Sequence, residues 1–523
     1  MSKDSPFSLS NTMKKNSLDY LYHQGSEAEV MEFKRLQHDF VPQFESVFPQ
    51  HDAPKTVVII PSLTLDQEIL SKVRGHVFYE ERMLCLMMLL RMPRTHITYV
   101  TSVPIDPIII DYYLHLLPGI TGYHARQRLT LLSCYDASSR SLTEKILERP
   151  RLIERIRRSI PEGHLAHLSC FNVTRFERSL SVKLGIPIYG CDPDLYFLGT
   201  KSKSRELFRD CGLTLPEGYE NLRDETDVVD ALVKLKTDHP GLKRAVIKMD
   251  DGFSGEGNAM FKFTEGVKGA ALRTWVNNNM SSMKCVADDL GYESFMAKFT
   301  SMNGIVEEFV EGIVKTSPSV QCRVNPLGKV DVISTHDQIL GGESGQVFMG
   351  ARFPAHKDYA VDIAAMGQAV ASKLRDYGTL GRFSVDFLSV REKDSWKHYA
   401  IEINLRKGGT THPFLMLQFL TDGVYDAAEG KYIMPNGQSR CYYATDNLRS
   451  EKYRGFTPHD LIEIAICNGL HYESTSQEGV MFHLIGALSQ YGKLGVVCIG
   501  KDQLSVDRIY DRTVKVLDEA KGS

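Results

Sequence analysis

The sequence lacks the features that mark secreted, membrane-spanning and metal-cluster proteins. Its longest apolar run, Met83–Leu90, stops at Arg91 and is far too short to cross a bilayer. Residues 1–16 contain no apolar core of the kind that a signal peptide needs. The ten cysteines are scattered singly, without a C-x-x-C pair, so we interpret them as buried thiols in a reducing cytoplasm. A net charge of −3 disfavours a protein that mainly grips nucleic acid. We therefore expect a cytoplasmic protein with no membrane or nucleic-acid partner.

Two common nucleotide-binding motifs are also missing. A phosphate loop of the form G-x-x-x-x-G-K-[ST] occurs nowhere in the chain. Pro61-Ser62-Leu63 follows the first expected strand, at the place where a dinucleotide-binding domain has its glycine-rich turn. We therefore expect the first domain to be a scaffold that helps to form a substrate cleft.

The pattern of strands and helices predicts several domains, since 523 residues are too many for one core. Residues 1–50 are polar and predict a loosely attached extension. In residues 51–196, strands alternate with helices, including a helical run at 81–91 and another at 141–160. This alternation predicts a Rossmann-like domain with a parallel sheet. Residues 197–425 predict a mostly antiparallel sheet, and residues 426–523 predict a smaller α+β domain. The fold class is thus α/β and α+β, in several domains.

The most informative pattern is an E-x-N-x-R strand. Glu402, Asn404 and Arg406 alternate, so their side chains share one face, while Ile401 and its alternate neighbours point into a core. Asp386 lies on the preceding strand, and a hairpin would bring it close to Glu402 and Asn404. Carboxylate and amide oxygens suit Mg²⁺, and arginine neutralises phosphoryl charge. A solvated polar strand face is the alternative for this motif taken alone.

A lysine and a glycine-rich loop form the second pattern. Lys248 ends an expected strand, and a loop with Gly252, Ser254, Gly255 and Gly257 follows it. Glycines let backbone N–H groups approach phosphate oxygens, and the lysine adds a compact positive charge. A glycine-rich hairpin tip without a ligand is the alternative.

The third pattern is an acidic, otherwise apolar strand at residues 304–312. Its centre, Glu307-Glu308-Phe309-Val310-Glu311, could hold an adenine by main-chain groups of Glu308 and Val310. Glu307 would accept from the adenine amino group, and Glu311 would meet a ribose hydroxyl. The alternative is an edge strand with solvated acids.

The order of these elements, from about Gly199 to Pro413, resembles the ATP-grasp superfamily. The run NLRKGGTTHP at 404–413 resembles the branch that contains the pheganomycin-type peptide ligase, and residues 479–495 resemble the C-terminal domain of that branch. The resemblance implies a Rossmann-like pre-ATP-grasp domain at 51–196 and an ATP-grasp domain at 197–425. It also implies these roles: Lys201 and Lys248 as the nucleotide-phosphate lysines, residues 252–258 as the mobile phosphate loop, residues 307–310 as the adenine hinge, Asp386, Glu402 and Asn404 as ligands of one or two Mg²⁺ ions, and Arg406 beside the transferred phosphate. Two departures are an aspartate at 386, where many relatives carry glutamate, and an anionic Glu256 in the glycine loop.

Several polar residues remain open between substrate contact and a structural role. His412 could contact an acyl phosphate or an amine, or could be a hydrogen-bonded turn residue. Arg323 and Arg352 could each grip a substrate carboxylate, or form a surface salt bridge. We expect His336 to be structural. Gly408, Gly409 and Thr410 are further candidates for substrate contact.

The expected function is that of an ATP-dependent carboxylate–amine ligase, with ATP and Mg²⁺ as cofactors. It would form an amide or peptide bond through an acyl phosphate, on amino acid or peptide substrates, and we allow for a homodimer. Two alternatives stay open: a small-molecule kinase that uses the same nucleotide site, and a non-catalytic nucleotide-binding sensor.

Overall fold

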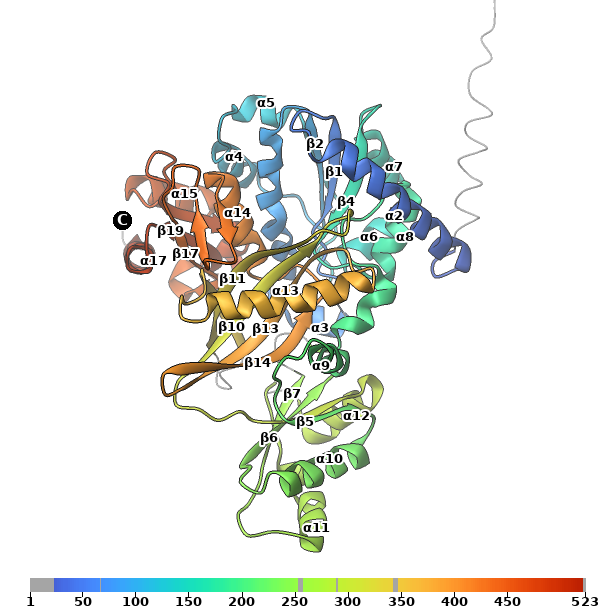
Figure 1. Cartoon of the computed structure of the whole chain (residues 1–523). Coiled ribbons are helices and arrows are strands. Elements are labelled where there is room, and N and C mark those ends of the chain that lie inside the picture. The colour runs from blue at the N-terminus through green and yellow to red at the C-terminus, as the bar shows by residue number, and fades with distance from the viewer. Residues whose placement is uncertain (1–22, 66, 253–256, 288–289, 342–346, 521–523) are drawn as a thin grey trace, which may run out of the picture.

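Three large β-sheets form the framework of the molecule. The computed structural model describes residues 23–65, 67–252, 257–287, 290–341 and 347–520. Within these residues, the larger sheets have four, eight and five strands. Figure 1 shows the four-stranded sheet at the top, the eight-stranded sheet across the middle and the five-stranded sheet below it.

The four-stranded sheet is parallel, as the sequence predicts, in the order β3-β2-β1-β4. Its first strand is buried along its whole length, which is typical of a strand covered on both faces. The predicted helix at 141–160 is two helices, because Pro150 begins the second one. The elements are β1 (Lys55–Ile60), β2 (Thr95–Thr101), β3 (Leu129–Ser133), β4 (Leu165–Cys170), α3 (Gln67–Lys72), α4 (Pro107–His115), α5 (Gly122–Arg126), α6 (Leu142–Leu147), α7 (Pro150–Arg158) and α8 (Arg175–Leu184).

Helix α2 (Glu27–Val47) corrects the expectation for the N-terminal segment. Phe33 and Leu36 on this helix are buried in one core with β1 and β4. Glu29 accepts a hydrogen bond from the Ser179 hydroxyl on α8. The Gln37 amide bonds both backbone groups of Ile188, at 3.0 and 2.7 Å. Residues 27–47 are therefore packed on the first domain and not loosely attached; residues 1–22 of the expected extension lie outside the described residues.

The apolar run after α3 is a long 3-10 helix, η1 (His76–Arg91), where we expected a helix at 81–91. It begins after Gly75, whose φ of 70° is in the left-handed region that suits glycine. Residues 80–88 are all buried, including the charged side chains of Glu80, Glu81 and Arg82. The helix contacts β2 and α4 on one side and C-terminal segments on the other, so it joins the two ends of the chain.

The five-stranded sheet is antiparallel in the order β5-β9-β6-β7-β8. It begins after helix α9 (Lys201–Asp210), which Thr200 caps at its N-terminus. The predicted strand at 304–312 ends at Glu308. The other elements are η2 (Pro193–Gly199), β5 (Gly218–Leu222), α10 (Glu225–Asp238), β6 (Arg244–Met249), β7 (Asn258–Lys262), α11 (Ala270–Asn279), η3 (Met280–Ser282), β8 (Lys284–Cys285), α12 (Tyr292–Met302) and β9 (Gly304–Glu308).

The eight-stranded sheet is also antiparallel, in the order β14-β13-β10-β11-β12-β17-β19-β18. Helix α13 (Ala360–Asp376) packs on β10 and β11, and Figure 1 shows it crossing the sheet. The strands are β10 (Lys315–Val324), β11 (Val330–Gly341), β12 (Val347–Phe353), β13 (Gly381–Glu392), β14 (Ser395–Asn404), β17 (Cys441–Arg449), β18 (Gly479–His483) and β19 (Lys493–Gly500).

The C-terminal segment extends this same sheet, because β12 pairs with β17. Its core is continuous with that of the first domain and with η1. The remaining elements are α14 (Thr411–Thr421), β15 (Val424–Asp426), β16 (Lys431–Ile433), η4 (Glu451–Tyr453), α15 (Pro458–Cys467), η5 (Ile485–Ala487), α16 (Leu488–Tyr491) and α17 (Gln503–Glu519).

The ten cysteines are all free thiols. Several are buried as the sequence predicts, but Cys467 is exposed. Among the helices of the described residues, none is long and apolar enough to cross a membrane.

Candidate active site

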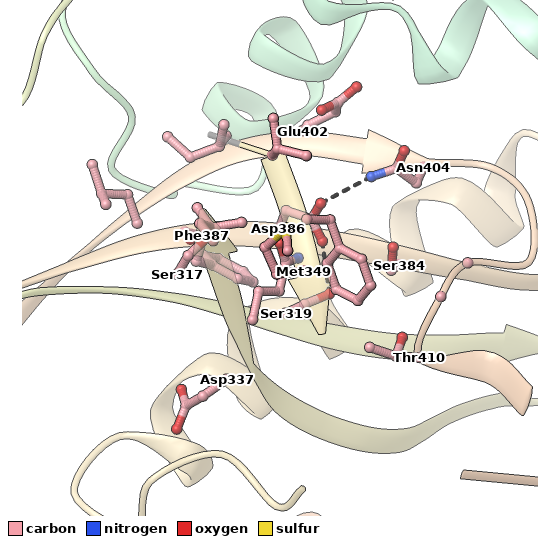
Figure 2. A pocket seen from close by; sticks show the side chains of 18 of the residues that line it. Ser317, Ser319, Asp337, Met349, Ser384, Asp386, Phe387, Glu402, Asn404 and Thr410 are labelled. Atoms are coloured by element: carbon pink, nitrogen blue, oxygen red, sulfur yellow. Dashed lines mark hydrogen bonds between the residues drawn. The ribbon is translucent and has the colours of Figure 1, made fainter. Parts of the chain in front are cut away.

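The β13–β14 hairpin places the predicted acidic residues together, as the sequence indicates. Asp386 lies directly opposite Glu402, and Asn404 lies opposite Ser384. The Asn404 Nδ2 donates a hydrogen bond of 3.0 Å to the Asp386 Oδ2, which Figure 2 shows as a dashed line. The sequence-based prediction of this hairpin is therefore confirmed.

A bulge in the hairpin changes the direction of Ile401. The register shifts after Asp386, so that Phe387 lies opposite Ala400 and Ile401 is the extra residue. A bulge turns a side chain away from its regular alternation. Ile401 is accordingly half-buried on the cavity wall and packs against Val310, instead of pointing into the core as the period of two predicts. Ile403 does lie in the core, with 1% exposure.

The electrostatics of the hairpin favour a cation. Burial raises the pKa of Asp386 to about 6; a hydrogen bond of 2.6 Å from the Ser319 hydroxyl opposes this rise, and the neighbouring Glu402 carboxylate adds to it. The Lys201 Nζ lies 3.5 Å from the Glu402 Oε1. The Arg406 Nη2 donates to the Asn404 Oδ1 at 3.1 Å. Two facing carboxylates in a low-dielectric site repel each other, and a positive ion would relieve that repulsion.

The donor set fits Mg²⁺ in its chemistry. It consists of two carboxylates and one amide, all oxygen ligands of the kind that hard divalent ions prefer. Within the described part of the chain, no group of three or more His, Cys, Asp and Glu residues forms a metal cluster. A site with only two acidic ligands is compatible with an ion that also binds phosphate oxygens.

The opposite wall carries Lys248 on β6. Its Nζ donates to the Glu307 Oε1 on β9, and the Arg205 Nη1 donates to the other Glu307 oxygen at 3.1 Å. Lys201 lies next to the glycine loop, since a Cβ built on Gly252 would be 3.7 Å from the Lys201 Nζ. Two predicted loop residues, Ser254 and Gly255, lie outside the described residues; Gly257 lies against Gly252.

The segment after β9 contains the residues for which the sequence predicts an adenine hinge. The Glu308 N–H donates to the Glu217 carbonyl at 2.7 Å. Two cations lie near the Phe309 ring: its centroid is 3.8 Å from the Arg244 guanidinium carbon and 4.4 Å from the Lys315 Nζ. Glu311 is half exposed and forms an ion pair of 2.7 Å with Arg244. This acid does not line the cavity, so the structure gives no support for its predicted contact with a ribose.

Both walls face one cavity of about 1510 Å³. This volume exceeds that of a typical small-ligand pocket, about 300–1,000 Å³, and leaves room for a second substrate. The cavity brings together the following predicted residues: Lys201, Lys248, Gly252, Gly257, Glu307, Glu308, Phe309, Val310, Asp386, Glu402, Asn404, Arg406, Gly408, Gly409 and Thr410.

The parallel sheet supports one end of this cavity. The Lys407 N–H donates to the Phe171 carbonyl at 3.1 Å, and its Nζ donates to the Cys170 carbonyl. These contacts fasten the loop after β14 to the carboxyl end of β4, and Phe171 itself lines the cavity. The carboxyl ends of parallel strands are where ligands bind in open α/β sheets.

Besides Glu311, three predicted residues do not line the cavity. Arg323 forms an ion pair with Asp331 at 2.6 Å, and Arg352 forms one with Asp507 at 2.5 Å, which is the salt-bridge alternative in both cases. His412 is buried in the first turn of α14, with its Nε2 3.0 Å from the Nε2 of His483. Burial lowers the pKa of His412. The prediction that it contacts an acyl phosphate is not supported, because the start of α14 turns its ring into the core. His336 is buried against Tyr442, in the structural role that we expected.

The structure adds cavity residues that the sequence did not reveal. They come from η1 and from the C-terminal strands: Tyr79, Arg82, Asp446, Arg449 and Lys493. No motif marks them. They reach the cavity only because η1 packs on the C-terminal segment and β17 joins the large sheet.

Comparisons with known proteins agree with this geometry. The family described as IQCH-like, ATP-grasp matches residues 194–284 and 274–428, and the family described as PGM1 C-terminal domain matches residues 460–513. The chain is 29% identical over 485 residues to L-propargylglycine–L-glutamate ligase of Streptantibioticus cattleyicolor, covering 90% of this chain and 95% of that protein. It is 21% identical over 442 residues to IQ motif-containing protein H of Danio rerio, covering 74% of this chain and 41% of that longer protein.

Solved structures share the fold. The biotin carboxylase domain of Hydrogenobacter thermophilus 2-oxoglutarate carboxylase, in complex with MgADP, ADP and bicarbonate, superposes with a TM-score of 0.54 at 11% identity, over 90% of this chain and 94% of that one. The ADP complex of purK, an N5-carboxyaminoimidazole ribonucleotide synthetase, gives 0.51 at 12% identity, over 90% and 98%.

Proposed function

Because the chain belongs to the ATP-grasp superfamily, we propose that it is an ATP-dependent carboxylate–amine ligase. One observation carries the proposal: Lys248, Gly252 and Gly257 face the Asp386–Glu402–Asn404 group across a single cavity. The relative with 29% identity is named as a ligase of two amino acids, which supports an amide-forming reaction here.

The nucleotide would bind between the two antiparallel sheets. The adenine would meet the main chain at residues 308–310, and the phosphates would lie over Lys248, Lys201 and the glycine loop. The Glu308 N–H and the Glu307 carboxylate already have partners within the protein. We therefore assign the adenine contacts to the Glu308 carbonyl and the Val310 N–H.

Asp386, Glu402 and Asn404 would hold Mg²⁺ at the far end of the triphosphate. When bound there, the ion would neutralise charge on the phosphate oxygens. Arg406, which is tied to Asn404, would add a positive charge beside the transferred phosphate.

The proposed reaction has two steps. A carboxylate oxygen of the first substrate attacks the γ-phosphorus of ATP, the bond to the β-phosphate oxygen breaks, and ADP leaves. An amine of the second substrate then attacks the carbonyl carbon of the acyl phosphate. The carbon–oxygen bond to phosphate breaks, and the amine loses its proton to the departing phosphate. Exclusion of water from the site during the reaction would protect the acyl phosphate from hydrolysis.

We propose an amino acid as at least one substrate, and an amino acid or peptide as the other. A cytoplasmic location and a homodimer remain our proposals from the sequence.

The test incubates purified protein with ATP, Mg²⁺ and pooled amino acids. We expect products lighter by one water than their summed substrates by mass spectrometry, together with equimolar ADP and phosphate. The Glu402→Gln variant should lose about 1,000-fold or more of turnover, since it removes one charge at the reacting phosphate. The matched control is Glu392→Gln, an exposed residue at the far end of the same hairpin.

The other functions would give different results. ADP with a phosphorylated product and no amide would support a kinase. Nucleotide binding with no turnover in either protein would support a sensor, and an absence of nucleotide binding in magnesium buffer would contradict the whole assignment.

A further inference from the structure

One end of the cavity has a charge pattern that the nucleotide does not explain. Beyond Arg406, the wall is formed by η1, β17 and β19, with Tyr79, Arg82, Asp446 and Lys493 among its residues. Arg82 and Asp446 are both buried, each with a side-chain exposure of 9%. This wall lies at the contact between the first domain and the C-terminal segment.

The guanidinium of Arg82 is held firmly but is poorly satisfied. Its central carbon lies 4.6 Å from the ring centroid of Tyr79 and 4.6 Å from that of Phe171, so the two rings fix its position. The Lys493 Nζ donates to the Tyr79 hydroxyl at 2.6 Å, which in turn fixes that ring. The Arg82 Nε has no hydrogen-bond partner within the described residues. The nearest Asp446 oxygen is 3.6 Å from the Arg82 Nη1, which is longer than a hydrogen bond.

A second arginine, Arg406, raises the free-energy cost of keeping the Arg82 guanidinium charged and buried without a bound anion. Burial lowers the pKa of Arg82, Asp446 opposes that effect, and the Arg406 guanidinium lowers the pKa further. Arg406 is thus close enough to repel Arg82, and both side chains line the same cavity. Buried cations are normally paired and hydrogen-bonded. A carboxylate bound at the Arg82 guanidinium would accept from its unsatisfied N–H and would offset this repulsion.

Asp446 adds an opposite charge beside this carboxylate position. It lines the cavity and lies at the Arg82 guanidinium, so a cation and an anion stand side by side. An α-amino acid carries its carboxylate and its amino group on one carbon, with the complementary charges. The first substrate loses the charge of its reacting carboxylate when the amide forms. The amino acid that supplies the amine keeps its own carboxylate throughout the reaction, so a fixed cation can bind it in every step.

We propose that Arg82 and Asp446 bind the α-carboxylate and the α-amino group of the amino acid that serves as amine acceptor. This inference rests on the proposed ligase function and adds the class of its second substrate. Arg82 supplies the planar donor for the α-carboxylate. Asp446 accepts a hydrogen bond from the α-amino group.

Binding experiments test the site without turnover. The protein is saturated with Mg²⁺ and the non-hydrolysable β,γ-imido analogue of ATP, and each of the common L-amino acids is titrated by calorimetry. We expect at least one to bind, and its α-carboxamide to bind about 10- to 100-fold more weakly, since a hydrogen bond to a charged group is lost. The N-acetyl derivative should also bind more weakly. Equal affinity for the acid and its carboxamide, or no binding by any amino acid, would overturn the inference.

Variants assign the effect to the two residues. Arg82→Gln should reduce affinity for the amino acid about 10- to 100-fold and leave affinity for the carboxamide unchanged. Asp446→Asn should reduce the discrimination against the N-acetyl derivative. The matched control is Arg91→Gln on the same helix, because Arg91 also pairs with a carboxylate, Asp422 at 2.6 Å, but does not line the cavity.

The outcomes separate this inference from the ligase proposal. Retained nucleotide binding shows that a variant is folded. The comparison of the amino acid with its carboxamide uses the unmodified protein, so it does not depend on the folding of any variant. Amino-acid binding that depends on Arg82, without any amide product, would contradict the ligase and leave the head-group site. Amide formation with unchanged acceptor KM in Arg82→Gln would contradict the head-group site and leave the ligase.

Discussion

At the scale of single side chains, Glu307 is a buried carboxylate that two cations share, Arg205 and Lys248. Its carboxylate accepts hydrogen bonds from Arg205 and Lys248, and its side chain is only 4% exposed. Arg205 also pairs with Glu220 at 3.1 Å. Glu307 therefore positions Lys248, the lysine that we propose binds phosphate, and compensates a buried arginine. For this reason we assign the adenine contacts to main-chain groups and not to the Glu307 carboxylate.

Removal of this charge should destabilise the protein. In Glu307→Gln, two cations share an uncharged amide, and the loss of one partner from a buried ion pair costs about 3 kcal/mol. We expect a clear fall in the thermal unfolding midpoint, measured by calorimetry. Glu311→Gln is the control on the same segment, since Glu311 is half exposed and its pair with Arg244 is worth about 0–1 kcal/mol. Equal and small effects of both changes would contradict the assigned role.

The sequence identified those site residues whose positions follow from the regular geometry of strands and hairpins. Glu402 and Asn404 share a face because strands alternate, and Asp386 reaches them because a hairpin is a local structure. Arg82 and Asp446 come from segments more than 300 residues apart, and their contact depends on tertiary packing that no local pattern encodes.

At the scale of elements, η1 joins the first domain to the C-terminal strands through polar contacts. The Gly486 N–H donates to both Glu81 oxygens, at 3.1 and 3.2 Å. Burial raises the pKa of Glu81 to about 8, and the hydrogen bond from Gly486 opposes this rise. The close approach requires a glycine, because a Cβ on Gly486 would lie 2.3 Å from a Glu81 oxygen and 2.5 Å from the Phe78 ring.

The Gly486→Ala substitution should therefore disturb the contact between η1 and η5. Overpacking of a buried site costs about 1–3 kcal/mol, so we expect a lower urea midpoint with an unchanged slope. Gly241→Ala is the control, since a Cβ there meets nothing within 4 Å, and its effect should stay within about 0.5 kcal/mol. A Gly486→Ala protein as stable as Gly241→Ala would show that this interface is plastic.

The elements themselves were only partly predictable. Local sequence signals mark both ends of helix α8, which begins with the capping box of Thr174 and Glu177 and ends at Gly185, whose φ is 71°. The strand at 304–312 was predicted too long, because β9 ends at Glu308 and the residues after it leave the sheet. The pairing of β12 with β17 was not foreseen, since strand order depends on non-local packing.

At the scale of the whole molecule, the cavity lies between two sheets that are built from separate parts of the chain. The five-stranded sheet supplies Lys248 and the hinge, and the eight-stranded sheet supplies Asp386, Glu402 and Asn404. In Figure 1 the five-stranded sheet lies below the rest of the molecule, with α9 at the junction. A nucleotide that contacts both walls would couple the two sheets.

Hydrogen exchange measured by mass spectrometry tests this coupling. The β,γ-imido ATP analogue is added with Mg²⁺ at 100 times its Kd. Binding should then stabilise the folded nucleotide site by about 2.7 kcal/mol. Local unfolding that disrupts the site, and the exchange that depends on it, should therefore slow about 100-fold. We expect slower exchange in β6 and β9 on one sheet and in β13 and β14 on the other. Helix α7, which does not line the cavity, should exchange at an unchanged rate through its local openings. Lys248→Met should weaken the protection on both sheets together, because the phosphates then lose a cation on which the bridge depends. Protection confined to one sheet would mean that the nucleotide does not span the cavity, and the two walls would then have to act on different ligands.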